Sequence, residues 1–259
     1  MQFSIGTKGW ICDALVNMHD EDQPLATQLL YGESVEILSE IDDDGFVKVK
    51  NFYDGYEGFI KASSISLEER AKPTHFTNAI KTFIHHEPDV KTKPLSYLPF
   101  AVEITLTDRQ ENGFGYAQDL GWVYLKNLTP IDEPVTDFIE TAKRFLNVPY
   151  LYGGRSMSGI DCSALVQLCL KTAGIKARRD AREQVLELGT LVTDNAPVDL
   201  TKIEFQKDDI IYFKGHVGMM VNDQDMIHAN ATAMCVSIDN LKEFVKNVNL
   251  PVTAVRRVK

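Results

Sequence analysis

The distribution of apolar residues changes near Pro134, and this change limits the possible folds more strongly than any other feature of the sequence. Between residues 12 and 66, short β-rich runs such as 34–38 and 46–49 alternate with turn clusters such as 42–45. Beyond Pro134, a helical spacing of apolar residues appears beside further strand-like runs. We therefore expect an all-β part followed by an α+β part.

The β-rich pattern occurs twice along the chain. Residues 35–37 (Val-Glu-Ile) have a counterpart in 102–104, and residues 58–60 (Gly-Phe-Ile) have one in 121–123 (Gly-Trp-Val), an offset of 63 to 67 residues. The element order, with a Gly-aromatic-aliphatic strand near the end of each copy, resembles that of bacterial SH3-like domains. The repeat predicts two small β-barrels in tandem.

A chain of 259 residues exceeds the usual size of a single domain, which also favours several compact parts. Proline-bracketed acidic residues near 129–134 are typical of a connector. We predict three domains: two SH3-like domains at residues 1–70 and 71–131, and a third domain at residues 132–259.

Charge and composition exclude several classes of partner. With 27 Lys and Arg against 37 Asp and Glu, the net charge is −10, which repels nucleic acid. No apolar run approaches the roughly 20 residues that cross a bilayer, so we expect no membrane association. The first ten residues lack the pattern of a signal peptide, and the four scattered cysteines indicate free thiols. We expect a cytoplasmic, monomeric protein.

The α+β part contains one helix that can be placed from its residues. Asp161 is a candidate N-cap, and offsets of 3, 4, 7, 8 and 11 from Cys162 fall on apolar residues before Gly174 ends the helix. Residues 135–147 also have a helical period. Downstream runs predict an antiparallel sheet against the helix, with strands at 210–213, 216–221, 226–229, 234–238 and 252–258.

Cys162 is the candidate nucleophile. A thiol in the first turn of a helix faces unpaired N–H groups and the positive end of the helix dipole, which favour the thiolate and can receive an oxyanion. Cys169 lies on the apolar stripe of this helix, and Cys235 lies within a strand. Both are interpreted as small buried hydrophobic residues.

His216 and His228 are the candidate partners of this thiol. A turn centred on Asn222 would place the two imidazoles directly opposite one another on one face of a hairpin. One could then accept the thiol proton while the other orients it. A core thiol with two hydrogen-bonded histidines is the structural alternative. Zinc would need three or four ligands, of which Cys162, His216 and His228 could supply three. Because no close ligand pair is present, we predict neither metal nor cofactor.

Four ordered motifs around these residues resemble the NlpC-type cell-wall peptidases, which are papain-like cysteine enzymes. They are VPYLYGG at 148–154, GIDCSALV at 159–166, GHVGMM at 215–220 and MIHA at 226–229. The resemblance covers about residues 134–259. It implies an α+β fold, with a papain-like NlpC catalytic domain preceded by two small SH3-like β-barrels.

The resemblance also implies roles for individual residues. Cys162 matches the family nucleophile, His216 the general base and His228 the residue that orients the base. Tyr150 matches a tyrosine that helps to hold the oxyanion. Further residues match the substrate site: Asp161 and Ser163 for the α-amino group of the substrate, Arg179 and Asp180 at the cleft, and Tyr56 with Glu21 from the first barrel at the amino-terminal end of the pocket.

The sequence departs from the family pattern at two of the matching positions. Tyr152 replaces a common tryptophan and keeps an aromatic wall, whereas Ala181 replaces a common serine and loses a hydroxyl group. Asp161 can alternatively be interpreted as a helix cap. Arg179 and Asp180 can alternatively be interpreted as part of a solvated loop.

The function implied by the resemblance is that of a cysteine endopeptidase. It would hydrolyse the γ-D-glutamyl bond to meso-diaminopimelate or L-lysine in a murein tripeptide or tetrapeptide with a free N-terminal L-alanine, during peptidoglycan recycling. Two other functions stay open at this point. One is a module that binds wall peptides or a protein through an inactive catalytic fold, and the other is amidase or acyltransferase chemistry on the same thiol.

Overall fold

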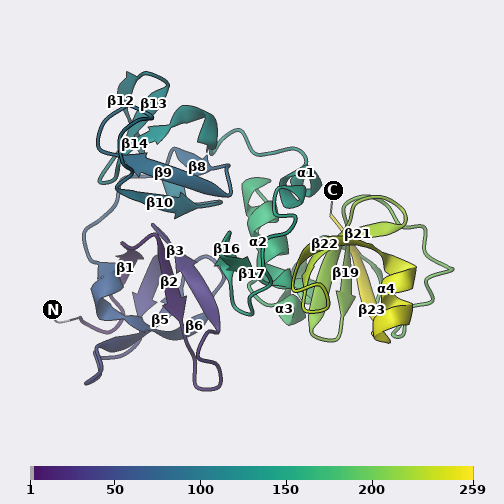
Figure 1. Cartoon of the computed structure of the whole chain (residues 1–259). Helices are drawn as coiled ribbons and strands as arrows, with labels where there is room; N and C mark the ends of the chain where they lie inside the picture. The colour runs from purple at the N-terminus through teal and green to yellow at the C-terminus, as the bar shows by residue number, and fades with distance from the viewer. Residues whose placement is uncertain (1–2, 259) are drawn as a thin grey trace. The chain divides into compact units, whose positions relative to one another are not determined.

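The computed structural model describes residues 3–258 and groups the chain into two compact units. Unit 1 is Met1–Pro134 and consists of strands with two short 3-10 helices, whereas unit 2 is Val135–Lys259 and contains all four α-helices of the described residues (Figure 1). The change of fold class therefore lies between Pro134 and Val135, and unit 2 begins three residues after residue 132, the predicted start of the third domain.

Unit 1 contains two successive sets of antiparallel strands. The first set is β1 (Lys8–Ile11), β2 (Leu15–Met18), β3 (Thr27–Leu30), β4 (Ser34–Ile37), β5 (Phe46–Asn51), β6 (Glu57–Lys61) and β7 (Ile65–Ser66). The second set is β8 (His75–Thr77), β9 (Lys81–His85), β10 (Ser96–Pro99), β11 (Glu103–Ile104), β12 (Leu106–Glu111), β13 (Phe114–Ala117), β14 (Gly121–Tyr124) and β15 (Leu128–Pro130).

The two sets repeat one pattern of strand pairing. β1 pairs with both β4 and β7, and β8 pairs in the same way with β11 and β15. In each set a short 3-10 helix, Ala62–Ser64 or Leu125–Asn127, precedes the last strand. Among the described residues no strand of one set pairs with a strand of the other. The sequence repeat thus corresponds to a structural repeat, while the boundary at residues 70 and 71 stays a prediction.

The glycine that opens the Gly-aromatic-aliphatic motif is explained by close packing. A Cβ atom at Gly58 would lie 2.7 Å from the carbonyl oxygen of His19, and one at Gly121 would lie 2.7 Å from that of His85. Alternate residues of β5, such as Val47 and Val49, fill the core of the first set. Only glycine lets the motif strand approach its neighbour this closely at both positions.

Unit 2 combines four helices with a six-stranded antiparallel sheet. The helices are α1 (Phe138–Lys143), α2 (Cys162–Thr172), α3 (Ala181–Glu187) and α4 (Leu241–Val248). The sheet has the order β18-β23-β19-β20-β21-β22, formed by Thr190–Thr193, Val252–Arg257, Asp209–Phe213, His216–Met220, Asp225–Asn230 and Cys235–Asn240. A two-stranded ribbon of β16 (Arg155–Ser156) and β17 (Gly159–Ile160) precedes α2.

The helix that carries Cys162 is buried against this sheet. α2 contacts β20, β21 and α1, and ten of its eleven residues are buried. Gly174 follows the helix with φ +75°, a left-handed conformation that suits glycine and ends the helix as predicted. The first helix is shorter than the predicted 135–147, and it starts at Phe138 because Asp137 caps it by accepting a hydrogen bond from the Glu140 amide.

The α+β fold with an SH3-like β region before it is therefore confirmed. Within residues 3–258, no helix combines the length and apolar character needed to cross a membrane.

Candidate active site

The candidate nucleophile occupies the first position of α2. Asp161 is the N-cap, with extended backbone angles of φ −97° and ψ 174°, and it accepts a hydrogen bond from the Ala164 amide. Cys162 is 8% exposed. The local sequence is sufficient to place this thiol, because an Asp cap and a helical apolar stripe both lie within residues 161–174.

The surroundings of the thiol act on its ionisation in opposite directions. Burial, followed by the neighbouring Asp161 carboxylate, raises the pKa of Cys162 to about 12. Hydrogen bonds from the backbone amides of Val217 and Ser163 favour the thiolate and limit this rise. Val217 follows His216 in β20, so the thiol and the predicted base are brought together from α2 and β20.

The two predicted histidines form a direct hydrogen bond. His216 Nε2 lies 2.7 Å from His228 Nδ1, and the ring centroids are 5.0 Å apart. Phe244 of α4 packs edge-on against His228. Burial, and next the neighbouring His228, lowers the pKa of His216 to about 3. The shifts at Cys162 and His216 together favour a neutral thiol beside a neutral imidazole before substrate binds.

The predicted register of the histidine hairpin is wrong by one turn position. Met219 pairs with Ile227 and Met220 with Met226, so the hairpin is centred on Asp223 rather than Asn222. The Asn222 side chain accepts from the amides of Gln224 and Asp225 and thereby moves the centre of the turn. The histidines stay on one face but lie diagonally across the strand pair, within hydrogen-bond distance.

A carboxylate that sequence reasoning missed extends the histidine pair. Asp239 Oδ2 lies 2.8 Å from His228 Nε2 and accepts a 2.6 Å hydrogen bond from the Ser237 hydroxyl. Its side chain is 42% exposed. The predicted strand ended at residue 238, whereas β22 continues to Asn240. The available signal was the spacing of Ser237 and Asp239, two polar residues at alternate positions in the sequence that follows His228. We call His216, His228 and Asp239 the histidine chain.

A second polar cluster lies beside the thiol and is fully buried. Arg179 donates to Asp161 Oδ1 at 3.0 Å, to Asp161 Oδ2 at 2.5 Å and to the Ser163 hydroxyl at 2.8 Å. These three residues, the Asp161 cluster, are 1% to 6% exposed. The structure thus brings together three of the predicted substrate residues, but as a mutually bonded group.

The Asp161 carboxylate is saturated with hydrogen bonds. Besides the two bonds from Arg179, it accepts from the amides of Gly153 and Ala164 and from the Ser163 hydroxyl. A carboxylate offers about four acceptor positions, so five donors leave no capacity for an ammonium group unless the cluster rearranges. The substrate roles of Asp161, Ser163 and Arg179 therefore stay predictions.

The other predicted substrate residues of unit 2 differ in their exposure and in their contacts. Tyr150 is partly exposed, and burial, followed by the charge of a Cys162 thiolate, raises the pKa of its hydroxyl group to about 12. It is therefore a neutral hydrogen-bond donor near Cys162. Tyr152 is 58% exposed. Asp180 is the N-cap residue of α3 and pairs with Arg182 at 3.1 Å.

Tyr56 and Glu21 lie in unit 1. Tyr56 packs partly buried against the core of the first strand set, and its amide donates to Asp54 Oδ1. Glu21 is exposed in a turn that Asp20 stabilises by accepting from the Asp22 and Gln23 amides. Their part in the substrate site stays a prediction.

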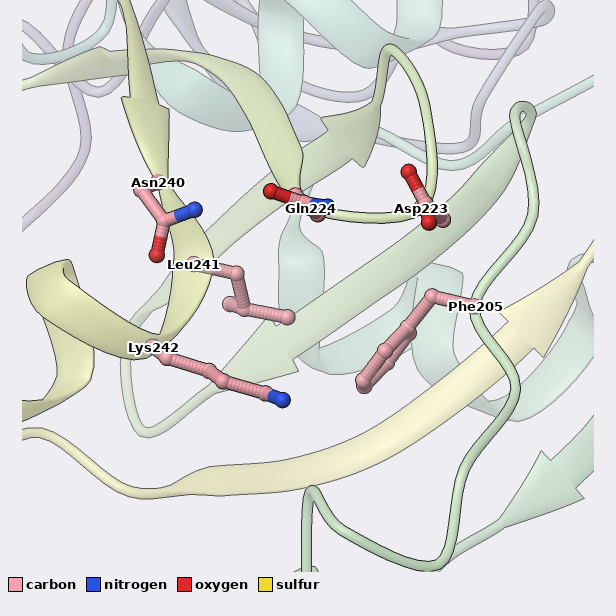
Figure 2. A pocket seen from close by; sticks show the side chains of 6 residues that line it. All are labelled: Phe205, Asp223, Gln224, Asn240, Leu241 and Lys242. Carbon is pink, nitrogen blue, oxygen red and sulfur yellow. The ribbon is translucent and has the colours of Figure 1, made fainter.

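Residues 3–258 contain no group of three or more His, Cys, Asp or Glu side chains arranged to hold a metal ion. A cavity of about 370 Å³ opens elsewhere on unit 2, where Figure 2 shows the side chains of Phe205, Leu241 and Lys242 around it. None of the three predicted catalytic side chains lines this cavity, so it does not belong to the candidate active site.

Comparison with known proteins gives the following similarities. Residues 147–252 match the model of the NlpC/P60 family, and residues 17–65 match that of the bacterial dipeptidyl-peptidase Sh3 domain. The chain is 27% identical over 260 residues to the gamma-D-glutamyl-L-lysine dipeptidyl-peptidase of Bacillus subtilis (strain 168), covering 91% of this chain and 82% of the relative. It is 24% identical over 242 residues to dipeptidyl-peptidase 6 of Lysinibacillus sphaericus, covering 85% of each.

Similarity to a solved structure extends over the whole fold. The crystal structure of an NlpC/P60 family protein from Bacillus cereus matches with a TM-score of 0.78 and 21% sequence identity, covering 97% of this chain and 99% of that one. This match supports the fold described above, including the β region that precedes the helix of Cys162.

Proposed function

We propose that this chain, which belongs to the NlpC/P60 cysteine peptidases and carries a bacterial SH3 domain, hydrolyses the bond between γ-D-glutamate and a diamino acid in murein peptides. The observation that carries the proposal is the hydrogen bond of 2.7 Å between His216 and His228 beside a thiol at a helix N-terminus. Relatives named gamma-D-glutamyl-L-lysine dipeptidyl-peptidase support the choice of substrate.

The site residues suggest a two-step mechanism. As Cys162 Sγ attacks the γ-carbonyl carbon, its proton moves to His216, and backbone amides at the start of α2 stabilise the oxyanion. Collapse breaks the amide bond, and His216 protonates the leaving amine of L-lysine or meso-diaminopimelate. Water then attacks the thioester with His216 as base, which releases L-Ala-D-Glu and restores the thiol.

The free N-terminus of the substrate is the finer part of the proposal. We propose, from the family resemblance at Tyr56 and Glu21, that the enzyme accepts only peptides with an unmodified N-terminal L-alanine. Such peptides are products of wall breakdown rather than intact wall. On this basis we propose a role in peptidoglycan recycling in the cytoplasm, which cell fractionation would test.

Mass spectrometry of four matched peptides tests the proposal. The peptides are L-Ala-γ-D-Glu linked to L-lysine or to meso-diaminopimelate, each with a free or an acetylated N-terminus. We expect a released diamino acid from at least one free peptide and from neither acetylated one. Cleavage of acetylated peptides would keep the peptidase and remove the recycling role. Release of ammonia or of a transferred acyl group would contradict the hydrolysis of this bond.

A further inference from the structure

We propose that Asp239 is a positioning residue of the active site: its carboxylate sets which nitrogen of each histidine carries the proton and thereby leaves Nδ1 of His216 as the base. The proposal deepens the proposed function and rests on it for the identity of the substrate. The hydrogen bonds themselves, however, can be examined without any substrate.

The direction of the histidine chain follows from its outer end. An ionised carboxylate can only accept hydrogen bonds, so Asp239 requires the proton of His228 to be on Nε2, at 2.8 Å. Neutral His228 then has a bare Nδ1, which must accept from Nε2 of His216 at 2.7 Å. The remaining nitrogen of neutral His216, Nδ1, is left without a proton. This is the nitrogen available to accept the proton of Cys162.

The Asp239 carboxylate is held in its charged form. Burial raises the pKa of Asp239, but hydrogen bonds from the Ser237 hydroxyl and from His228 outweigh it and place the pKa below its ordinary value. Near neutral pH, Asp239 is therefore an acceptor. During turnover the thiol proton moves to His216 and then to the leaving amine, while His228 and Asp239 keep their protonation states.

Asn230 makes the carboxylate necessary, because it would impose the opposite arrangement. The Asn230 oxygen accepts from the Ala233 amide at 2.7 Å, which turns its Nδ2 towards Ser237 and His228. This amide nitrogen lies 3.2 Å from His228 Nε2. Without Asp239, a hydrogen bond from Asn230 to His228 would favour the proton on Nδ1 of His228. His216 would then accept at Nε2 and carry its proton on Nδ1. A protonated Nδ1 could not accept the proton of Cys162.

The position of Asp239 also makes the proposal testable by chemical rescue. The side chain is 42% exposed and lines a cavity of about 200 Å³ together with Asn230, Phe244 and Asn247. Removal of the carboxylate by Asp239→Ala would enlarge a space that a small acid can reach. Formate carries the same acceptor group and can replace the missing oxygen beside His228.

The experiment compares the full-length wild type with Asp239→Ala, Asp239→Asn and a matched control. The control is Asp225→Asn, since Asp225 is a carboxylate in β21 that accepts from Asn222 and Asn240 and contacts neither histidine. Iodoacetamide alkylation of Cys162 is followed at pH 7 by peptide mass spectrometry, and ¹⁵N NMR identifies the protonated ring nitrogens. Thermal unfolding of every variant reports its folding.

We expect Asp239→Ala to slow the alkylation of Cys162 and to lower kcat about 10- to 100-fold. This loss is smaller than that for an orienting carboxylate that is hydrogen-bonded to the base itself. KM should change less than about threefold, and formate should restore at least part of both rates. Asp239→Asn should fall between, because Ser237 can keep its oxygen towards His228 without the charge. The control should match the wild type.

Two results would overturn the proposal. One is a wild-type NMR spectrum with the proton of neutral His216 on Nδ1, and the other is a folded Asp239→Ala protein with wild-type alkylation and ring protonation. Neither measurement uses a peptide substrate. Slower alkylation of Cys162 in Asp239→Ala, combined with no cleavage of any murein peptide by the wild type, would therefore count against the proposed function and leave the role of Asp239 intact.

Discussion

The two polar clusters beside Cys162 are built differently. In the Asp161 cluster, a buried guanidinium and carboxylate neutralise one another through two parallel hydrogen bonds. In the histidine chain, single hydrogen bonds connect His216, His228 and Asp239 and end at a half-exposed carboxylate. The closed cluster fixes the start of α2, where the thiol sits, whereas the open chain controls the proton that the thiol must lose. Position and protonation of the nucleophile are thus set by separate groups.

The largest expected effect on chemistry belongs to the histidine chain. His216→Gln removes the base but keeps an amide that can donate to His228, so kcat should fall by about 10⁴-fold or more. The free energy of unfolding should change by less than about 1 kcal/mol. Peptide kinetics and urea denaturation of the same preparations measure the two quantities. A large loss of stability would place His216 among the structural residues.

The largest expected effect on stability belongs to the Asp161 cluster. Arg179→Ala leaves Asp161 as an uncompensated buried charge, which should cost about 3–5 kcal/mol in urea denaturation. Arg178→Ala is the matched control, because Arg178 forms an exposed pair with Glu187 and should contribute less than about 1 kcal/mol. Unchanged stability with a raised KM would instead assign Arg179 to substrate binding and would contradict a purely structural role of the Asp161 cluster.

Acid should destabilise unit 2 through the histidine chain. His216 has a folded pKa of about 3 against an ordinary value of 6.5, so between these values the unfolded chain binds more protons than the folded one. Stability therefore falls as pH falls below 6.5, by at most about 1.4 kcal/mol per pH unit for this group. The pKa of His228, lowered mainly by burial, acts with the same sign.

Denaturation of the full chain at several pH values between 7 and 5 measures this slope. The His216→Gln protein should have a shallower slope than the wild type, because it lacks one of the groups that titrate. Equal slopes in the two proteins would mean that the pKa of His216 is the same in the folded and unfolded states.

The smallest expected effects come from removing one hydroxyl group in each cluster. One removal should change mainly the stability and the other mainly kcat. Ser163→Ala removes a partner of Arg179 and should cost about 1–3 kcal/mol of stability. Ser237→Ala removes a donor to Asp239 and should lower kcat only a few-fold, with little change in stability. Denaturation and peptide kinetics of both variants test this crossed pattern. The same pattern in both variants would contradict the division between the two clusters.

The parts of the site that depend on local sequence could be predicted. The Asp cap, the apolar stripe and the closing glycine of α2 all lie within 14 residues, and they placed Cys162 correctly. The motif strands of unit 1 were likewise predictable, because their glycines are required by the close approach of a neighbouring strand. The families suggested by these residues match the comparisons.

The parts that depend on turn geometry or on distant packing could not be predicted. The side chain of Asn222 shifted the hairpin by one position, which changed the histidines from opposite to diagonal neighbours. The partner of Arg179 is 18 residues away and depends on how the loop before α3 folds back onto α2. Asp239 was not predicted, because its strand is longer than its apolar residues indicate.

Mass spectrometry of the acid-quenched reaction shows whether Cys162 carries the acyl group of a γ-D-glutamyl peptide. With L-Ala-γ-D-Glu-L-Lys or its meso-diaminopimelate analogue, we predict an L-Ala-γ-D-Glu adduct on the peptide that contains Cys162. Cys162→Ala should show neither the adduct nor released diamino acid. Full turnover by Cys162→Ala, or an adduct on another residue, would exclude Cys162 as the nucleophile.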